Sequence, residues 1–318
     1  MALTFIRGLH NLHRLQGDVV RHGGVVATIG SFDGVHIGHQ AVLAQVRERA
    51  VALGLPSMVM VFEPQPYEFF SGEHAPARLM RLRDKVQAIV HSGIERVFCL
   101  QFNQRLRSLS AQDFIDDVLV RGIDVKSLIV GDDFRFGCDR RGDYALLCAA
   151  GEQHGFEVVR NATVEVGGER VSSTRIRCAL EASDFVLAER LLGKPYAMHG
   201  CVAYGQQLGR TIGVPTANVH LRRYRSPLAG VFAVDVTVCG QRLQGVANVG
   251  VRPTVGGLPK PILEVHLLDF SGDLYGQQMS VVFRHRLRDE QKFASLDALR
   301  EQILADIDQA RAWFYQHK

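Results

Sequence analysis

One stretch of the sequence constrains the fold more than any other: it runs from Gly30 to His39 and reads GSFDGVHIGH. An apolar run that ends at Ile29 precedes it, and apolar residues at helical spacing follow it as far as Leu53. A strand, a turn of small residues and a helix start hold phosphate well, because the first N–H groups of a helix are unpaired and its dipole attracts anions. The sequence therefore predicts a phosphate-binding turn between a strand and a helix.

Two histidines lie in this stretch. His36 and His39 are three residues apart, so in the first turn of a helix they share one face. Two imidazoles at such a place donate hydrogen bonds to a polyphosphate and stabilise charge that develops in a transition state. The other interpretation is a pair of surface histidines in a helix-capping loop, and the spacing alone leaves both open.

The first half of the chain alternates short apolar runs with helical patterns. This alternation predicts a parallel sheet with helices on both faces, that is, a doubly wound α/β domain. Ligands of such sheets bind beyond the carboxyl ends of the strands, so the loops after Ile29, Phe62 and Val130 are expected to converge. The expected strands are residues 3–7, 24–29, 57–62, 96–100, 128–130 and 156–159, and the expected helices are 37–53, 79–92, 110–121 and 144–154.

Two of these loops carry aromatic residues. One holds Phe62 and Tyr67 around two prolines, which are expected to interrupt regular structure, and the other holds Phe134 and Phe136. A flat aromatic ligand beside a nucleotide suits loops of this composition. Core aromatic side chains that extend into loops explain the same pattern, and the sequence does not choose between the two.

A second helix start lies in the segment from Val171 to Arg177. Ser173 or Thr174 is expected to cap the helix, and Arg177, one turn further on, reaches the anion that the helix start attracts. A plain Ser/Thr cap with arginines that face solvent is the alternative.

The second half has a different texture, and a length of 318 residues favours two domains. Short strands with Gly-rich turns are expected at residues 198–204, 231–239, 243–249, 262–269 and 279–283, which predicts a small antiparallel β-barrel. A helix from Ser295 to about Tyr315, with Leu296 and Ala310 on its inner face, ends the chain. The predicted domains are residues 1–184 and 185–318.

The barrel half contains the segment GRTIGVPTAN, from Gly209 to Asn218. Its two glycines with basic and hydroxyl groups between them can form a backbone cradle for phosphate. Thr216 and Asn218 lie on one side of an extended strand and offer oxygen ligands to a hard cation such as Mg²⁺. An ordinary Gly-Pro turn followed by polar strand residues is the alternative.

Glu264 is a carboxylate in an otherwise apolar strand. If it points inward, its burial needs a purpose, and a general base that takes a proton from an attacking hydroxyl is such a purpose. If it points outward, it is the polar side of an alternating strand.

Composition excludes several classes of protein. The net charge is +4, and no dense Lys/Arg run indicates a nucleic-acid partner, so a nucleic-acid-binding protein that uses the mild basic excess is only an alternative. The six cysteines form no Cys-x-x-Cys pair, so neither a zinc site nor a disulfide framework is expected. No apolar run is long enough for a membrane span and no signal peptide is evident, so the expected location is the cytoplasm. The sequence does not indicate an oligomeric state.

Four segments of the first half together resemble known proteins. Gly30 to His39 resembles the signature of the nucleotidylyltransferase superfamily, and Val171 to Arg177 its second motif in bacterial FAD synthetases. The loops from Phe62 to Pro66 and from Gly131 to Gly137 match the same proteins, which often have Asn at the position of Asp133. The resemblance implies that His36 and His39 are catalytic, that ATP binds to Gly30, Ser31, Phe32, Asp33, Gly38, Ser173, Thr174 and Arg177, and that the flavin binds to Phe62, Pro64, Pro66, Asp133, Phe134 and Phe136.

Two segments of the second half resemble the riboflavin kinase module, a six-stranded barrel. They are Gly209 to Asn218, in which Val214 stands where Phe is usual, and Leu263 to Phe270. The resemblance implies that Glu264 is the base, that Thr216 and Asn218 hold Mg²⁺, and that this ATP binds to Gly209, Arg210, Thr211, Gly213, Pro215, Thr216 and Asn218.

The two modules follow each other in the order found in bifunctional bacterial FAD synthetases. The resemblance implies phosphorylation of riboflavin to FMN by ATP, then adenylylation of FMN by a second ATP to give FAD and pyrophosphate. FMN and FAD are then product ligands, and riboflavin, FMN and ATP the small-molecule partners. An alternative is a single-function nucleotidylyltransferase whose C-terminal barrel only binds flavin. The string from His36 to His39 also equals the first signature of class I aminoacyl-tRNA synthetases, but no Lys-Met-Ser-Lys-Ser-like segment follows.

Overall fold

The structure is a computed structural model, and it describes residues 4–12, 23–131, 133–205, 213–221, 223–254 and 257–317. The chain forms two compact units. Unit 1 comprises Met1–Pro76 and Leu82–Ser172, and unit 2 comprises Ala77–Arg81 and Ser173–Lys318. Each unit is described by itself. The predicted boundary after residue 184 stays a prediction.

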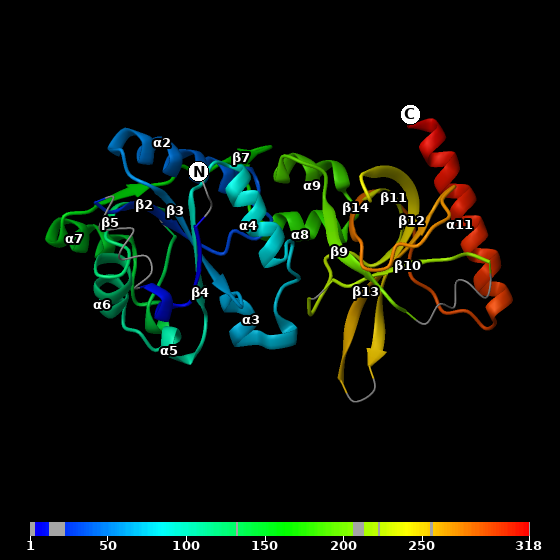
Figure 1. Cartoon of the computed structure of the whole chain (residues 1–318), viewed down its shortest axis with the longest axis horizontal. Helices are drawn as coiled ribbons and strands as arrows, with labels where there is room; N and C mark the ends of the chain where they lie inside the picture. The colour runs from blue at the N-terminus through cyan, green and yellow to red at the C-terminus, as the bar shows by residue number, and fades with distance from the viewer. Residues whose placement is uncertain are drawn as a thin grey trace. The chain divides into compact units, whose positions relative to one another are not determined.

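Unit 1 contains a six-stranded sheet in the order β1-β4-β3-β2-β5-β6, and all of its pairings are parallel. This confirms the predicted doubly wound α/β fold (Figure 1). A separate hairpin, β7-β8, lies outside the sheet. The strands are β1 Thr4–Arg7, β2 Val25–Ile29, β3 Ser57–Glu63, β4 Arg96–Gln101, β5 Val125–Val130, β6 Glu157–Arg160, β7 Glu165–Val166 and β8 Glu169–Arg170.

Helices cover both faces of this sheet. The central strand β2 is buried at all five positions, as a strand covered on both faces must be. One face packs against Phe114 to Leu119 and Leu147, and α2 lies on the other side (Figure 1). The helical segments of unit 1 are η1 Leu9–Asn11, α2 Ile37–Leu53, α3 Pro66–Ser71, η2 Gly72–His74, α4 Leu82–His91, α5 Gln104–Arg107, α6 Ala111–Asp113, η3 Phe114–Val120, η4 Cys138–Arg140 and α7 Tyr144–His154.

The helix predicted at residues 110–121 is present, but most of it is wound more widely than an α-helix. Ser110 caps it, since its Oγ accepts a hydrogen bond from the N–H of Asp113 at 3.0 Å. The following segment η3 is a π-helix, and beyond it the N–H of Arg121 donates to the carbonyl of Asp116 at 2.9 Å, five residues back. Apolar spacing predicts that a helix exists, and it does not distinguish these two windings.

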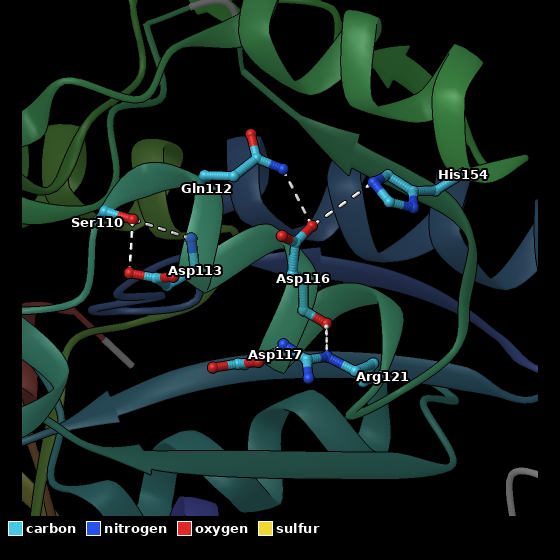
Figure 2. A network of polar contacts seen from close by, with 7 residues as sticks. All are labelled: Ser110, Gln112, Asp113, Asp116, Asp117, Arg121 and His154. Carbon is cyan, nitrogen blue, oxygen red and sulfur yellow. Dashed lines mark hydrogen bonds and ion pairs between the residues drawn. The ribbon is translucent and has the colours of Figure 1, made fainter.

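Asp116 is the centre of a polar network on the outside of this helix (Figure 2). Its carboxylate accepts a hydrogen bond from Gln112 at 3.0 Å and lies 3.5 Å from Nε2 of His154 on α7. Its carbonyl also accepts from Nε of Arg121 at 3.3 Å. The network joins η3 to α7 on the sheet face opposite α2, away from the phosphate turn.

Three helix starts differ from the sequence-based expectation. The two prolines were expected to interrupt regular structure, and β3 does end at Glu63 before Pro64. The sequence did not predict that Pro66 begins α3, which it can do because the first helical position needs no N–H donor. Helix α4 begins at Leu82 rather than at residue 79. Helix α8 (Ser173–Glu181) begins at Ser173 itself, so Ser173 and Thr174 lie in its first turn instead of capping it from outside.

Unit 2 contains six strands that close into an antiparallel barrel, in the order β10-β13-β12-β11-β14-β9. This confirms the predicted barrel (Figure 1). The hairpin from β11 to β12 turns at Cys239 and Gly240, whose φ values of 50° and 74° match the tight turn that suits twisted strands. The elements that belong to the barrel or precede it are α8, α9 Phe185–Leu192, β9 Ala197–Ala203, β10 Ala217–Val219, β11 Gly230–Val238, β12 Gln241–Thr254, β13 Gly257–Leu267 and β14 Gln278–Arg288.

The last helix, α11 (Leu296–Gln316), packs against the outside of the barrel on β11, β12 and β14. Ser295 caps it by accepting a hydrogen bond from the N–H of Ala298 at 3.1 Å. The predicted inner face was partly wrong: Ala310 is buried, but Leu296 is 55% exposed. Asp306 is buried instead, because Arg288 on β14 donates two hydrogen bonds of 2.8 Å to its carboxylate.

Candidate functional site

The predicted phosphate turn, residues 30–39, connects β2 to α2 in unit 1. Helix α2 begins at Ile37, and His36 is its cap: Nδ1 of the imidazole accepts a hydrogen bond from the N–H of His39 at 3.3 Å. Because Nδ1 accepts, the ring proton of a neutral His36 lies on Nε2. Gly38 leaves room for this ring, since a Cβ there would lie 3.1 Å from Nδ1.

The two histidines are stacked on each other. Their ring centroids are 3.6 Å apart at an interplanar angle of 16°, and the ring of Phe32 lies 4.9 Å from that of His39 on a tilt. The predicted juxtaposition of His36 and His39 is therefore present. His36 reaches this stacked pair from the cap position of α2, and not from inside the helix as the spacing argument assumed.

The environment keeps His39 uncharged. Burial lowers the pKa of His39 well below its ordinary value of 6.5, and the nearby charges of His36 and Lys85 lower it further. Nδ1 of His39 is buried and has no hydrogen-bond partner within the described part of the chain. A neutral imidazole with an unpaired buried nitrogen at a helix start can bind an anionic ligand through a hydrogen bond.

The aromatic loops lie next to the phosphate turn by topology. Strand β2 is flanked by β3 and β5, so the loops that follow these three parallel strands leave the same edge of the sheet. Phe62 packs edge-on against Phe102 with the ring centroids 5.7 Å apart, and Phe134 stacks on Phe136 with the ring centroids 5.6 Å apart. Phe136 is buried in the core that Phe62 and Phe134 contact, so these rings pack the core as well as facing the loops.

The remaining predicted flavin residues of unit 1 are Pro64, Pro66 and Asp133. Pro64 follows a cis peptide bond, and Pro66 begins α3. Asp133 is exposed, and its carboxylate accepts a hydrogen bond from Nη1 of Arg170 at 2.8 Å. This hydrogen bond lowers the pKa of Asp133, and the positive charge of Arg170 lowers it further.

The second predicted phosphate motif belongs to unit 2. In the first turn of α8, Thr174 is exposed and Ser173 is half-buried. Nε of Arg177 donates a hydrogen bond of 2.6 Å to the carbonyl of Ala77, which belongs to the same unit. Arg177 is therefore fixed by the short segment Ala77–Arg81.

In the barrel, three polar side chains form a row across neighbouring strands. Glu264 on β13 is directly opposite Asn218 on β10 on one side and Asn248 on β12 on the other. Opposite residues of antiparallel strands share a face with their Cβ atoms about 5 Å apart. We call Asn218, Glu264 and Asn248 the polar row.

The polar row lies on the outer face of the barrel. Leu263 and Val265, which flank Glu264, are buried in the barrel interior, so Glu264 points the other way and is half-buried. The sequence left both orientations open, and the structure selects the outward one. Outward orientation does not make the row fully solvated: Oδ1 of Asn248 is buried, and within the described residues it has no hydrogen-bond partner.

Gly205 and the residues just before β10 lie next to Asn218, at one end of the polar row. The carboxamide of Asn218 lies so close to Gly205 that a Cβ there would be 2.4 Å from its nitrogen. Just before β10, the carbonyl of Pro215 accepts a hydrogen bond of 2.9 Å from Nδ1 of His266, and Thr216 is half-buried. Gly213 is exposed at the start of this segment, whereas Gly209, Arg210 and Thr211 lie outside the described residues.

The donor set suits a hard cation. The hydroxyl of Thr216 and the carboxamide of Asn218 offer neutral oxygens, the ligand type that Mg²⁺ accepts. In the described residues no group of three or more His, Cys, Asp and Glu side chains forms a metal cage.

Comparison with known proteins covers both units. A family model described as FAD synthetase matches residues 19–175, and one described as riboflavin kinase matches residues 192–314. The bifunctional riboflavin kinase/FMN adenylyltransferase of Pseudomonas fluorescens is 58% identical over 310 residues, 98% of this chain and 97% of that protein. That of Escherichia coli K12 is 50% identical over 313 residues, 98% of each. The chain belongs to the bifunctional riboflavin kinase/FMN adenylyltransferase family.

A solved structure also shares the architecture. A protein from Streptococcus pneumoniae, described as a macrolide-efflux protein, superposes with a TM-score of 0.76 and 30% identity over 98% of this chain and all of its own. Among the described residues of this family member, no helix has the length and apolar character that a membrane crossing requires.

Sequence reasoning missed two polar residues next to these sites. Lys85 on α4 is completely buried. The one signal in the sequence was its position four residues before the buried Ile89, which puts both residues on the same helix face. Asn248 lies between the buried Ala247 and Val249, and a polar residue within such an apolar run was a detectable signal.

Proposed function

We propose that unit 2 phosphorylates riboflavin at the polar row and that the phosphate turn of unit 1 binds the ATP that adenylylates FMN. The two reactions make FMN and then FAD, as family membership indicates. The observation that supports the assignment most directly is that each unit has, at its proposed site, a buried polar atom with no hydrogen-bond partner among the described residues. These atoms are Nδ1 of His39 and Oδ1 of Asn248.

In the kinase reaction, the 5′-hydroxyl oxygen of riboflavin attacks the γ-phosphorus of ATP, and ADP leaves. Glu264 takes the proton of the attacking hydroxyl, since it is the carboxylate of the polar row. Thr216 and Asn218 would hold Mg²⁺, which when bound neutralises phosphate charge. Asn248, next to Glu264 in register, is placed to orient the hydroxyl or the base.

In the adenylyltransferase reaction, a phosphate oxygen of FMN attacks the α-phosphorus of ATP, and pyrophosphate leaves. The nucleophile is already an anion, so no protein base is needed. His36 and His39 would donate hydrogen bonds to the triphosphate at the start of α2, where the helix dipole also favours negative charge. Ser173, Thr174 and Arg177 are proposed further ATP ligands.

The loops after β3 and β5 are proposed to bind the flavin of FMN. Phe62, Phe134 and Phe136 supply aromatic surface, while Pro64 and Pro66 shape the loop between β3 and α3. Asp133 is proposed to contact FMN in place of the Asn that relatives often have. Its ion pair with Arg170 keeps it charged.

The function is tested by incubating the chain with riboflavin, ATP and Mg²⁺ and separating the flavins with time. FMN should form first with release of ADP, and FAD should follow with release of pyrophosphate. FAD formation from added FMN, without any ADP release from riboflavin, would instead support the alternative of a single-function adenylyltransferase with a flavin-binding barrel.

A further inference from the structure

Lys85 is a buried cation beside the phosphate turn. It lies on α4, its side chain is completely buried, and Nζ donates a hydrogen bond of 2.6 Å to the carbonyl of Ser31. Burial of an ammonium group is costly unless partners compensate it, so a lysine at a core position needs a role that an apolar residue could not fill. The mechanism above does not use it.

The turn that Lys85 contacts has a strained backbone. Phe32 and Val35 have φ values of 47° and 43°, in a region that side chains other than glycine rarely adopt, and both are buried. Such residues persist only where the surrounding structure holds them. The turn is held through its carbonyls: Lys85 binds that of Ser31, and Nε2 of Gln40 binds that of Val35 at 2.9 Å.

Holding a carbonyl fixes the direction of the next N–H group. A trans peptide is planar, and its C=O and N–H point to opposite sides. When Lys85 draws the Ser31 carbonyl into the protein, the N–H of Phe32 turns the other way. Gln40 has the same effect on the N–H of His36. The N–H groups of Phe32 and His36 are four residues apart in the same turn, and N–H groups that face out of one turn can bind an anion together.

We propose that Lys85 is a positioning residue for ATP in the adenylyltransferase: it holds the Ser31 carbonyl so that the turn presents its N–H groups to the phosphates, and it places a fixed positive charge behind them. This inference rests on the proposed binding of ATP at the phosphate turn. The positive charge of Lys85 is close enough to act on this turn, since it is one of the causes that lower the pKa of His39.

The test compares Lys85→Met, which removes donor and charge, with Lys85→Gln, which keeps an N–H donor one bond shorter. Lys126→Met is the matched control, because Lys126 is a partly exposed lysine of the same unit that pairs with Asp124. FAD formation from FMN is followed as a function of ATP and of FMN, below the melting transition of each variant. FMN formation from riboflavin is measured on the same samples.

For Lys85→Met we expect the KM for ATP to rise about 10- to 100-fold, the loss typical of a hydrogen bond to a charged group, with little change in the KM for FMN. Lys85→Gln should recover part of this loss, and kinase activity should be unchanged in both. A merely structural lysine would lower the melting temperature of both variants and leave the KM for ATP at the control value.

Two outcomes would overturn the proposal. One is an unchanged KM for ATP in Lys85→Met or, if that variant does not fold, in Lys85→Gln. The other is an equal rise in the KM values for ATP and FMN, which reports general distortion. If His39→Ala still loses FAD formation in either case, only the role of Lys85 fails. If His39→Ala also keeps full FAD formation, the proposed ATP site fails with it.

Discussion

The phosphate turn and the polar row differ in how the chain assembles them. The turn is one continuous segment, held by a strand, a helix start and the buried Lys85. The polar row takes one residue from each of three strands, and only the pairing of β10, β13 and β12 brings Asn218, Glu264 and Asn248 together. The phosphate turn can therefore be recognised in the sequence as a motif, whereas the polar row depends on strand register.

The two sites also differ in charge, and the difference matches their nucleophiles. The turn combines the neutral imidazole of His39 with the buried cation Lys85, which suits an attacking phosphate that is already an anion and needs no protein base. The polar row has a carboxylate between two amides, which suits a hydroxyl that must lose a proton. One chain thus carries two ATP-dependent transfers with different protein chemistry.

The sharpest test of this contrast is Glu264→Gln, which keeps the shape of the side chain and removes the base. We expect FMN formation to fall about 10³-fold, within the range for loss of a general base. Adenylylation of supplied FMN should continue at the wild-type rate. Glu301→Gln on the exposed side of α11 is the control. Normal kinase turnover in Glu264→Gln would remove Glu264 from the mechanism.

The reciprocal change is His36→Ala or His39→Ala. Each should lower FAD formation from FMN about 10²- to 10³-fold, the cost of losing a donor to transition-state charge, while riboflavin is still phosphorylated. His91→Ala, an exposed histidine on α4, should have no effect. Equal loss of both activities would contradict the division of labour between the units.

Asn248→Ala tests whether strand register defines the kinase site. Loss of the hydrogen bond that Asn248 is proposed to make to the hydroxyl or the base should lower kcat/KM for riboflavin about tenfold, and FAD formation from FMN should not change. Gln244→Ala, at an exposed position of the same strand, is the control. Wild-type kinetics in Asn248→Ala would show that the row ends at Glu264.

The smallest effect is on stability and concerns the charge state of His39. Because its folded pKa lies below 6.5, the unfolded chain takes up a proton before the folded one does as the pH falls below about 6.5. The uptake of this proton should lower the free energy of unfolding by up to about 1.4 kcal/mol for each pH unit of acidification. Urea unfolding between pH 7.5 and about pH 5.5 should show a shallower fall in His39→Asn. Parallel pH profiles would mean that His39 titrates normally.

Much of the fold could be predicted from local pattern. The apolar runs located all six strands of the unit 1 sheet, and α2 ends at Leu53 as expected, with Gly54 after it at a φ of 65°. Two details escaped because they depend on packing. The π-helical winding of η3 and the burial of Asp306 against Arg288 leave no trace in helical spacing. Strand β10 has three residues, too few for an alternating pattern, yet it closes the barrel.

The sequence by itself determined the two-part fold and the residues of the phosphate turn, because a strand, a glycine-rich turn and a helix start are properties of neighbouring residues. It also marked Glu264 as unusual without deciding its direction. Only the tertiary structure decided that Glu264 faces outward in a row with Asn218 and Asn248, since that follows from strand pairing. The proposed role of Lys85 was likewise hidden, because Lys85 and Ser31 are 54 positions apart in the sequence and meet only when α4 packs beside the turn.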